Sequence, residues 1–130
     1  MYLLDTNTLI YFFKGVGKVA DHLLDQEPAN IFISSITLYE LAYGIAKSNN
    51  PQQRQQQLSK FIDEIEVIGF HHKEATAAGL IRAKLEQKGT PIGPYDILIA
   101  ATAVANNKIL VTHNTKEFKR IKECKIEDWY

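Results

Sequence analysis

The sequence has one cysteine and no segment long enough to cross a membrane. The single thiol, Cys124, excludes an intrachain disulfide and a cysteine-based zinc site, which fits a reducing compartment. The longest strongly apolar stretch covers residues 97–105, is interrupted by Thr102, and is far shorter than the ~20 residues that a membrane helix needs. The N-terminus lacks a basic region and reaches Asp5 before any apolar segment develops. We therefore expect no secretory signal, no membrane association and a protein that stays in the cytoplasm.

The chain also lacks an excess of charge of either sign, because 15 Lys and Arg balance 15 Asp and Glu. Its 130 residues, 45% of them hydrophobic, exclude intrinsic disorder and predict a single domain over residues 1–130. The charge is uneven, since segment 108–125 carries six basic residues against Glu117 and Glu123. Such a segment is either a solvated terminal face or a contact for a polyanion, and charge alone does not decide between them.

Hydrophobic patterns predict short strands that alternate with helices. Strand-like apolar runs cover residues 2–4, 31–33, 67–68 and 108–112, with an edge strand near Ile126. The first two helices are expected over residues 6–13, with Gly15 ending the helix, and over residues 18–24. A third helix should begin at a cap formed by Ser35. Three more are expected from Pro51 through Ile65, from Ala75 to near Gly89, and over residues 97–105. The last of these has almost no polar face and is therefore expected to be buried. This alternation predicts an α/β fold with a central, mainly parallel β-sheet flanked by helices on both faces.

Three carboxylates occupy positions where such a fold binds its ligands, beyond the carboxyl ends of the strands. Asp5 follows the first strand, Glu40 lies within the helix after the second, and Asp96 begins the buried helix. Each has an ordinary explanation: Asp5 as a helix cap, Asp96 as a partner of the helix dipole, and Glu40 as an exposed residue. Brought together without a neighbouring Lys or Arg, they would repel one another unless a cation lay between them. Oxygen ligands favour Mg²⁺, with Mn²⁺ as a substitute, and such an ion suits phosphodiester hydrolysis by an activated water.

Four motifs follow one another along the chain: Leu4-Asp5-Thr6-Asn7, residues 35–41 followed by Gly44, residues 92–101 around Asp96, and residues 110–118 around Asn114. In this order they resemble the motifs of PIN-domain ribonucleases, and especially those of the VapC toxins of bacterial toxin–antitoxin pairs. The resemblance spans nearly the whole chain. It implies a PIN-like fold and a Mg²⁺-dependent endoribonuclease that acts as a toxin.

The resemblance also assigns roles to polar residues. The catalytic set that it implies is Asp5, Thr6, Asn7, Glu40, Asp96, Asn114 and Glu117. Within this set Asp5, Glu40 and Asp96 match the metal ligands, and the two polar residues beside Asp5 would orient ligands or the attacking water. The fourth acidic position departs from the pattern, because Asn114 replaces an Asp and Glu117 follows three residues later. Since Asn brings no charge, we expect one firmly held ion and a weaker second site unless Glu117 contributes.

The partners that the resemblance implies are an RNA substrate, with tRNA as one class, a second copy of the chain in a homodimer, and a VapB-like antitoxin in a larger assembly. An antitoxin Arg entering the acidic pocket would suit a cluster of carboxylates. Segment 108–125 then becomes an expected contact for the RNA backbone, beginning beside the site, and His113 a candidate phosphate contact. Tyr39, Tyr43 and Tyr95 would stack on unpaired bases, although core or dimer packing is expected for at least two of them.

Two other functions stay open on the residues alone. A phosphatase similar to the haloacid dehalogenases would use Asp5 as its nucleophile, but it needs an acid two positions later, where Asn7 stands. A catalytically weak PIN-like module that binds RNA or protein is harder to exclude, because Asn114 already weakens the acidic set. RNA cleavage that requires Mg²⁺ and is lost in Asp5→Ala and Asp96→Ala would separate a nuclease from such a module.

Overall fold

The computed structural model describes residues 1–130 and contains a five-stranded β-sheet in which all paired strands are parallel. The strands are β1 (Tyr2–Leu4), β2 (Ile31–Ser34), β3 (Glu66–Ile68), β4 (Ile109–Val111) and β5 (Ile126–Glu127), in the spatial order β3-β2-β1-β4-β5. From the central strand β1 the chain first builds β2 and β3 on one side and later β4 and β5 on the other. The carboxyl end of β1 therefore lies at the point where the strand order reverses, which is where open α/β sheets form a binding crevice.

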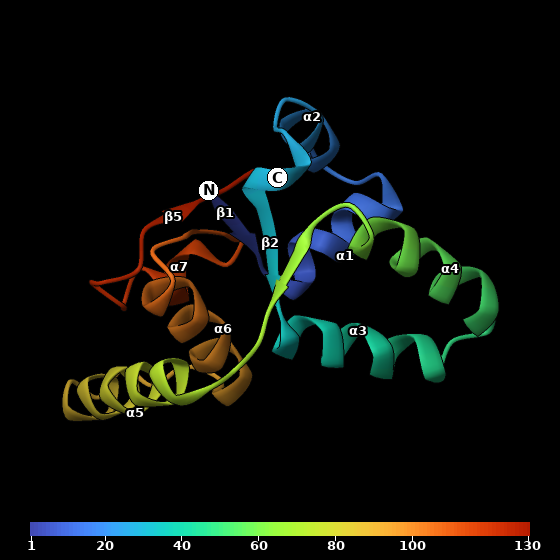
Figure 1. Ribbon diagram of the computed structural model, residues 1–130. Helices are drawn as coiled ribbons and strands as arrows, with labels where there is room; N and C mark the ends of the chain where they lie inside the picture. Colours follow the sequence, from blue (N-terminus) through green and yellow to red (C-terminus); the bar gives the residue numbers. More distant parts are fainter.

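Helices cover both faces of this sheet, as the sequence predicts (Figure 1). They are α1 (Thr6–Lys14), α2 (Val19–Leu24), α3 (Ser35–Ala46), α4 (Pro51–Ile62), α5 (His72–Gln87), α6 (Pro94–Ala105) and α7 (Thr115–Phe118), with a 3-10 turn at Pro28–Asn30. Leu3 of β1 belongs to a buried cluster with residues of α5 and α6, whereas its neighbour Leu4 belongs to a second cluster with residues of α1 and α4. None of the helices is both long and apolar enough to span a membrane.

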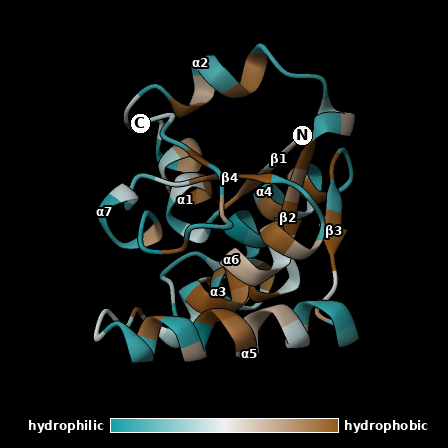
Figure 2. Ribbon diagram, turned by 90° about the vertical axis from the view of Figure 1, so that its left-hand side faces the viewer, coloured by the Kyte–Doolittle hydropathy of each residue, from teal (hydrophilic) through white to brown (hydrophobic).

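The buried helix α6 confirms the prediction made for residues 97–105. Ala100, Ala101 and Ala103 are fully buried, and Figure 2 shows hydrophobic segments gathered around β2 and α6. Thr102 is equally buried, but its Oγ1 donates to the carbonyl oxygen of Leu98 at 2.8 Å, so its hydroxyl is not left without a partner. Because α6 is enclosed in this way, the residues of its first turn are held firmly at the crevice.

Helix ends lie close to their predicted positions, with small differences. Gly15 ends α1 in the left-handed conformation that the sequence predicts, with φ at 67°. The cap of α3 is Ser34 rather than Ser35, since the Oγ of Ser34 accepts the N–H of Thr37 at 3.0 Å. Helix α4 ends at Ile62, so the expected helix through residue 65 is three residues too long.

A buried carboxylate sets the start of α5. Glu74 is 1% exposed, and its oxygens accept the N–H of His71 and the Nδ2 of Asn106, both at 2.9 Å. The bond from His71 closes the first turn, so α5 begins at His72 rather than at the expected Ala75. Burial alone raises the pKa of Glu74, but the hydrogen bonds from Asn106 and from backbone N–H groups lower it below its ordinary value. The ionised carboxylate therefore stabilises the junction of α5 with the end of α6.

Replacing this carboxylate should destabilise the fold. We expect Glu74→Gln to lower the free energy of unfolding at pH 7 by about 1–3 kcal/mol, because a buried donor then faces another donor. Since the pKa of Glu74 is lowered in the folded protein, its contribution is present above the ordinary value of 4.5 and is lost as the pH falls below it. The matched control is Glu86→Gln on the same helix, where an exposed Glu pairs with Arg82. Denaturant unfolding that finds the two variants equally stable would contradict this role.

Candidate active site

Asp5 joins the end of β1 to the start of α1 and is only 5% exposed. Its Oδ1 accepts the N–H of Thr8 at 2.9 Å, and its own N–H donates to the carbonyl oxygen of Val111 at 3.0 Å. Burial raises the pKa of Asp5, hydrogen bonds from Thr112 and Thr8 oppose that rise, and the charge of Glu40 adds to it. Asp5 is thus the predicted helix cap, and it is also held rigidly at the switch point of the sheet.

Glu40 is turned towards this crevice from α3. Its Oε1 accepts a hydrogen bond from Thr6 Oγ1 at 2.6 Å, and Thr6 Oγ1 lies 3.1 Å from the hydroxyl of the fully buried Thr37. Glu40 is half-buried, so the ordinary explanation of an exposed mid-helix residue is wrong. Thr6, which the resemblance expects to orient ligands, contacts the Glu40 carboxylate and fixes its direction.

Asp96 lies in the first turn of α6 and is half-buried. Burial raises its pKa to about 6, together with the negative charges of Asp5, Glu117 and Glu40, in that order. No Lys or Arg is among the groups that shift the pKa of Asp96. The charges of three other carboxylates therefore act on Asp96 across the crevice.

Asn114 and Glu117 form the corner of the crevice beyond β4. The Nδ2 of Asn114 donates to Glu117 Oε2 at 2.9 Å, and the Asn114 N–H donates to Thr112 Oγ1 at 3.0 Å. The negative charge at this corner is therefore supplied by Glu117, whose effect reaches Asp96. Asn7 lies exposed on α1, beside the buried Asp5.

The carboxylates of Asp5, Glu40 and Asp96 are oxygen ligands of the kind that a hard dication prefers, but their side chains are not already arranged around one metal position. Carboxylate oxygens are the ligands that Mg²⁺ and Mn²⁺ prefer. As the side chains stand, no group of three His, Cys, Asp or Glu residues converges closely enough to hold an ion. Protein-bound Mg²⁺ commonly keeps several waters and takes only one or two carboxylates directly. Metal binding by Asp5, Glu40 and Asp96 stays a prediction.

Two residues that the sequence places beside the crevice contact other parts of the chain. His113 Nδ1 lies 3.0 Å from Asp128 Oδ2, and its ring stacks on that of Tyr130 with centroids 4.1 Å apart. Lys108 precedes β4 and therefore lies at the opposite end of this strand, with Nζ 4.1 Å from the ring centroid of Phe32. The expectation that segment 108–125 begins beside the crevice is consequently wrong.

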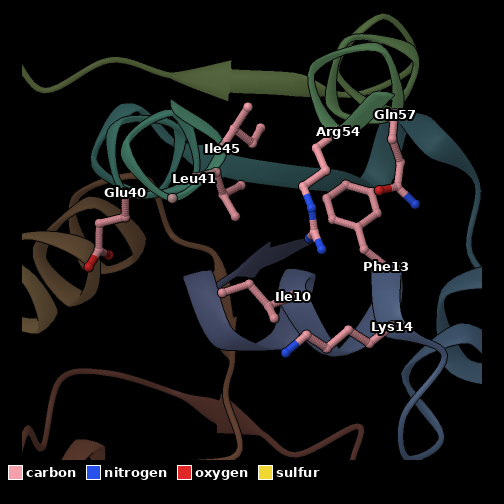
Figure 3. A pocket seen from close by; sticks show the side chains of 9 residues that line it. Ile10, Phe13, Lys14, Glu40, Leu41, Ile45, Arg54 and Gln57 are labelled. Carbon is pink, nitrogen blue, oxygen red and sulfur yellow. The ribbon is translucent and has the colours of Figure 1, made fainter. Parts of the chain in front are cut away.

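A pocket of about 220 Å³ opens beside Glu40, between α1, α3 and α4 (Figure 3). Its apolar lining includes Ile10, Phe13, Leu41 and Ile45, and its polar lining includes Lys14, Arg54 and Gln57. Figure 3 shows Glu40 at one end of the pocket, pointing away from Arg54 and Lys14. The polar residues of α1 and α4 are not predicted as functional by the sequence, because they belong to no motif and meet only through the packing of these helices.

The three tyrosines that are expected to stack or pack are all exposed: Tyr39 by 53%, Tyr43 by 60% and Tyr95 by 45%. The rings of Tyr39 and Tyr95 meet edge to face at 5.6 Å, next in sequence to Glu40 and Asp96. The chain therefore buries none of them in its own core, and the expected core packing is wrong. Base stacking and dimer packing stay predictions.

Comparison with known proteins identifies the class to which this fold belongs. The family model of the PIN domain matches residues 2–123. The structure superposes on DNA-bound VapBC from Salmonella typhimurium with a TM-score of 0.93 at 40% identity, covering 99% of this chain and 98% of that chain. It superposes on VapBC2 from Rickettsia felis, bound to a promoter DNA fragment, with a TM-score of 0.91 at 43% identity and the same coverage. The architecture is that of a PIN domain.

The sequences of curated proteins narrow this class further. The chain is 41% identical over 128 residues to the tRNA(fMet)-specific endonuclease VapC of Salmonella typhimurium, covering 98% of this chain and 97% of that protein. It is 42% identical over 134 residues to ribonuclease VapC2 of Rickettsia felis, covering 99% and 98%. The chain belongs to the PIN-domain family and, within it, to the VapC ribonucleases.

Proposed function

We propose that the protein is a Mg²⁺-dependent endoribonuclease and the toxin of a toxin–antitoxin pair, with Asp5, Glu40 and Asp96 as the residues that hold the ion. The observation that carries this proposal is the position of Asp5, Glu40 and Asp96 around the carboxyl end of β1, where Thr6 binds Glu40 at 2.6 Å and the charges of Asp5 and Glu40 act on Asp96. A dication between these groups relieves the repulsion, and Mn²⁺ can substitute for Mg²⁺ because both take oxygen ligands.

Each residue of the crevice would have its own role in hydrolysis. When bound, the ion supplies a Lewis acid and an activated water for in-line attack on the phosphodiester. Asp5 cannot rotate freely because it caps α1, and Thr6 holds the Glu40 carboxylate in place through its 2.6 Å hydrogen bond. Asn7, exposed beside Asp5, would orient ligands of the ion or the attacking water. Asn114 directs the Glu117 carboxylate, so that a second, weaker ion position would depend on Glu117.

We propose RNA as the substrate, with tRNA as the first class to test, since one relative is a tRNA(fMet)-specific endonuclease and another is a ribonuclease. Purified protein would be incubated with total RNA and with bulk tRNA, and the new ends would be mapped. We expect discrete cuts with Mg²⁺ or Mn²⁺ and none without an ion. Asp5→Asn is the matched variant, because Asn is also a good helix cap and should keep the fold while it removes the charge. Binding without cleavage under either ion would instead favour a module that only binds RNA or protein.

A VapB-like antitoxin is the proposed partner, because the two solved neighbours described above are VapBC complexes. The apolar pocket beside Glu40 offers surface for a partner segment, and an Arg from that segment would pair with the carboxylates of the crevice. We propose a homodimer as the form of the toxin within this larger assembly.

A further inference from the structure

A basic cleft of about 310 Å³ lies between the C-terminal part of α5 and the turn that follows α7. The charged side chains that line it are those of Lys84, Lys88, Arg120, Lys122 and Glu123, which amount to four cations and one anion. The two cations after α7 belong to the basic segment noted in the sequence. The two from the end of α5 lie more than thirty residues earlier and join them only in the folded chain.

The exposed side chains that line this cleft are charged, and its apolar lining residues are buried. The apolar lining residues Ile81, Leu85 and Ile121 are 5% exposed or less, so they present almost no surface to a ligand. Glu123 is occupied by Lys84, whose Nζ lies 2.7 Å from its Oε1. This hydrogen bond, with the charges of Lys84 and Lys88, lowers the pKa of Glu123. Lys88 and Lys122 are both exposed and take part in no ion pair, so the cleft keeps an excess of positive charge.

Hydrogen bonds of Arg120 connect the cleft to segments that lead into the acidic crevice. The Nη1 of Arg120 donates to the carbonyl oxygen of Pro91 at 2.9 Å, and its backbone N–H donates to the carbonyl oxygen of Glu117 at 3.0 Å. Pro91 precedes Asp96 by only five residues, which span at most ~18 Å even when fully extended. A nucleic-acid strand bound at the crevice can therefore continue into the cleft.

We propose that this cleft binds backbone phosphates of the RNA strand next to the bond that is cut. The inference rests on the proposed ribonuclease function and names where its substrate is held. Spaced Lys and Arg side chains are sufficient for phosphate binding, which is mainly electrostatic. An acidic protein segment fits less well, because protein interfaces centre on aromatic or large apolar anchors and this cleft exposes none.

The test removes the two cations of the cleft that form no ion pair and no side-chain hydrogen bond. Lys88→Gln with Lys122→Gln keeps the bonds from Lys84 to Glu123 and from Arg120 to Pro91. The matched control is Lys60→Gln with Lys73→Gln, which removes two exposed charges that form no ion pair and lie outside the cleft. Binding of bulk tRNA would be measured against salt concentration in an Asp96→Asn background, so that no RNA is cut.

We expect the cleft variant to reduce the slope of log K against log[salt] by about 0.7–0.9 for each phosphate that is no longer neutralised, or about 1.4–1.8 in total. Its affinity should fall about tenfold or more at moderate salt, while the control keeps the parent slope. In protein with Asp96 intact, KM should rise by a larger factor than kcat falls.

A slope and an affinity equal to those of the control would overturn the proposal. So would unchanged RNA binding together with loss of the antitoxin complex, which would assign the cleft to a protein partner. Because binding is measured without cleavage, the two proposals can fail separately. A chain that shows the slope change but never cuts RNA would refute the nuclease function and leave the cleft as an RNA site.

Discussion

Asp96→Asn should abolish RNA cleavage and, in metal-free protein at neutral pH, raise the melting temperature. Removing a ligand of the ion forfeits several kcal/mol of transition-state stabilisation, or about 10²–10⁴-fold in rate. The pKa of Asp96 determines whether Asp96→Asn is more or less stable than wild type at neutral pH. The pKa of Asp96 is about 6 in the folded protein against an ordinary 3.8, so folding favours the protonated form. The cost of ionising Asp96 is absent below pH 3.8, grows as the pH rises through 6, and is present in full above it.

Thermal unfolding at pH 7.5 and at pH 4, in a chelating buffer, checks this sign. The difference in melting temperature between Asp96→Asn and wild type should be clear at the higher pH and small at the lower one. Asp63→Asn, at an exposed acid after α4, is the control and should both cut RNA and melt like wild type. A metal-free Asp96→Asn protein that melts below wild type at pH 7.5 would show that the carboxylates do not strain the fold.

Divalent ions should be required for cleavage and should stabilise the folded chain. We expect a chelator to stop cleavage completely and Mg²⁺ or Mn²⁺ to restore it. An ion that binds only the folded form stabilises it by about 1.4 kcal/mol at ten times its Kd, which for 130 residues is about 5 °C in melting temperature. Because protons compete for Asp96, both the shift and the cleavage should weaken as the pH falls through about 6.

The matched measurement repeats the titration with Asp96→Asn, for which the shift should be much smaller. Sodium chloride at equal ionic strength separates specific binding from screening, since screening acts on all exposed charges. If millimolar Mg²⁺ left the melting temperature of wild type unchanged, the assignment of the crevice as a metal site would have to be abandoned.

The parallel sheet and its buried helix could be predicted because their residues are apolar in short runs with few polar positions. The same patterns do not locate a helix cap among adjacent polar residues. Ser34 and Ser35 are equally good caps, and only the geometry at the end of β2 selects the first. The hydrogen bond from Asn106 to Glu74, more than thirty residues away, likewise forms only in the folded chain.

The acids of the site could be predicted from their places after strands and from their motifs. Their surroundings could not, because these depend on contacts between distant segments. Thr6 binds Glu40 across two helices, and His113 turns away from the crevice because Asp128 returns beside it. The basic cleft is the clearest case. Its residues form no motif, and Lys88 reaches Arg120 and Lys122 only through the packing of α5.

Asp5 follows a strand, caps a helix and faces the crevice. The same carboxylate therefore stabilises the fold and belongs to the proposed active site. A genetic screen for loss of toxicity should therefore recover changes at this position for two unrelated reasons. Asn keeps an acceptor for the N–H of Thr8 and yields an intact but inert protein. An aliphatic residue leaves that N–H without its partner and lowers the amount of folded protein in the cell. Cellular abundance, rather than growth, distinguishes the two classes of mutant.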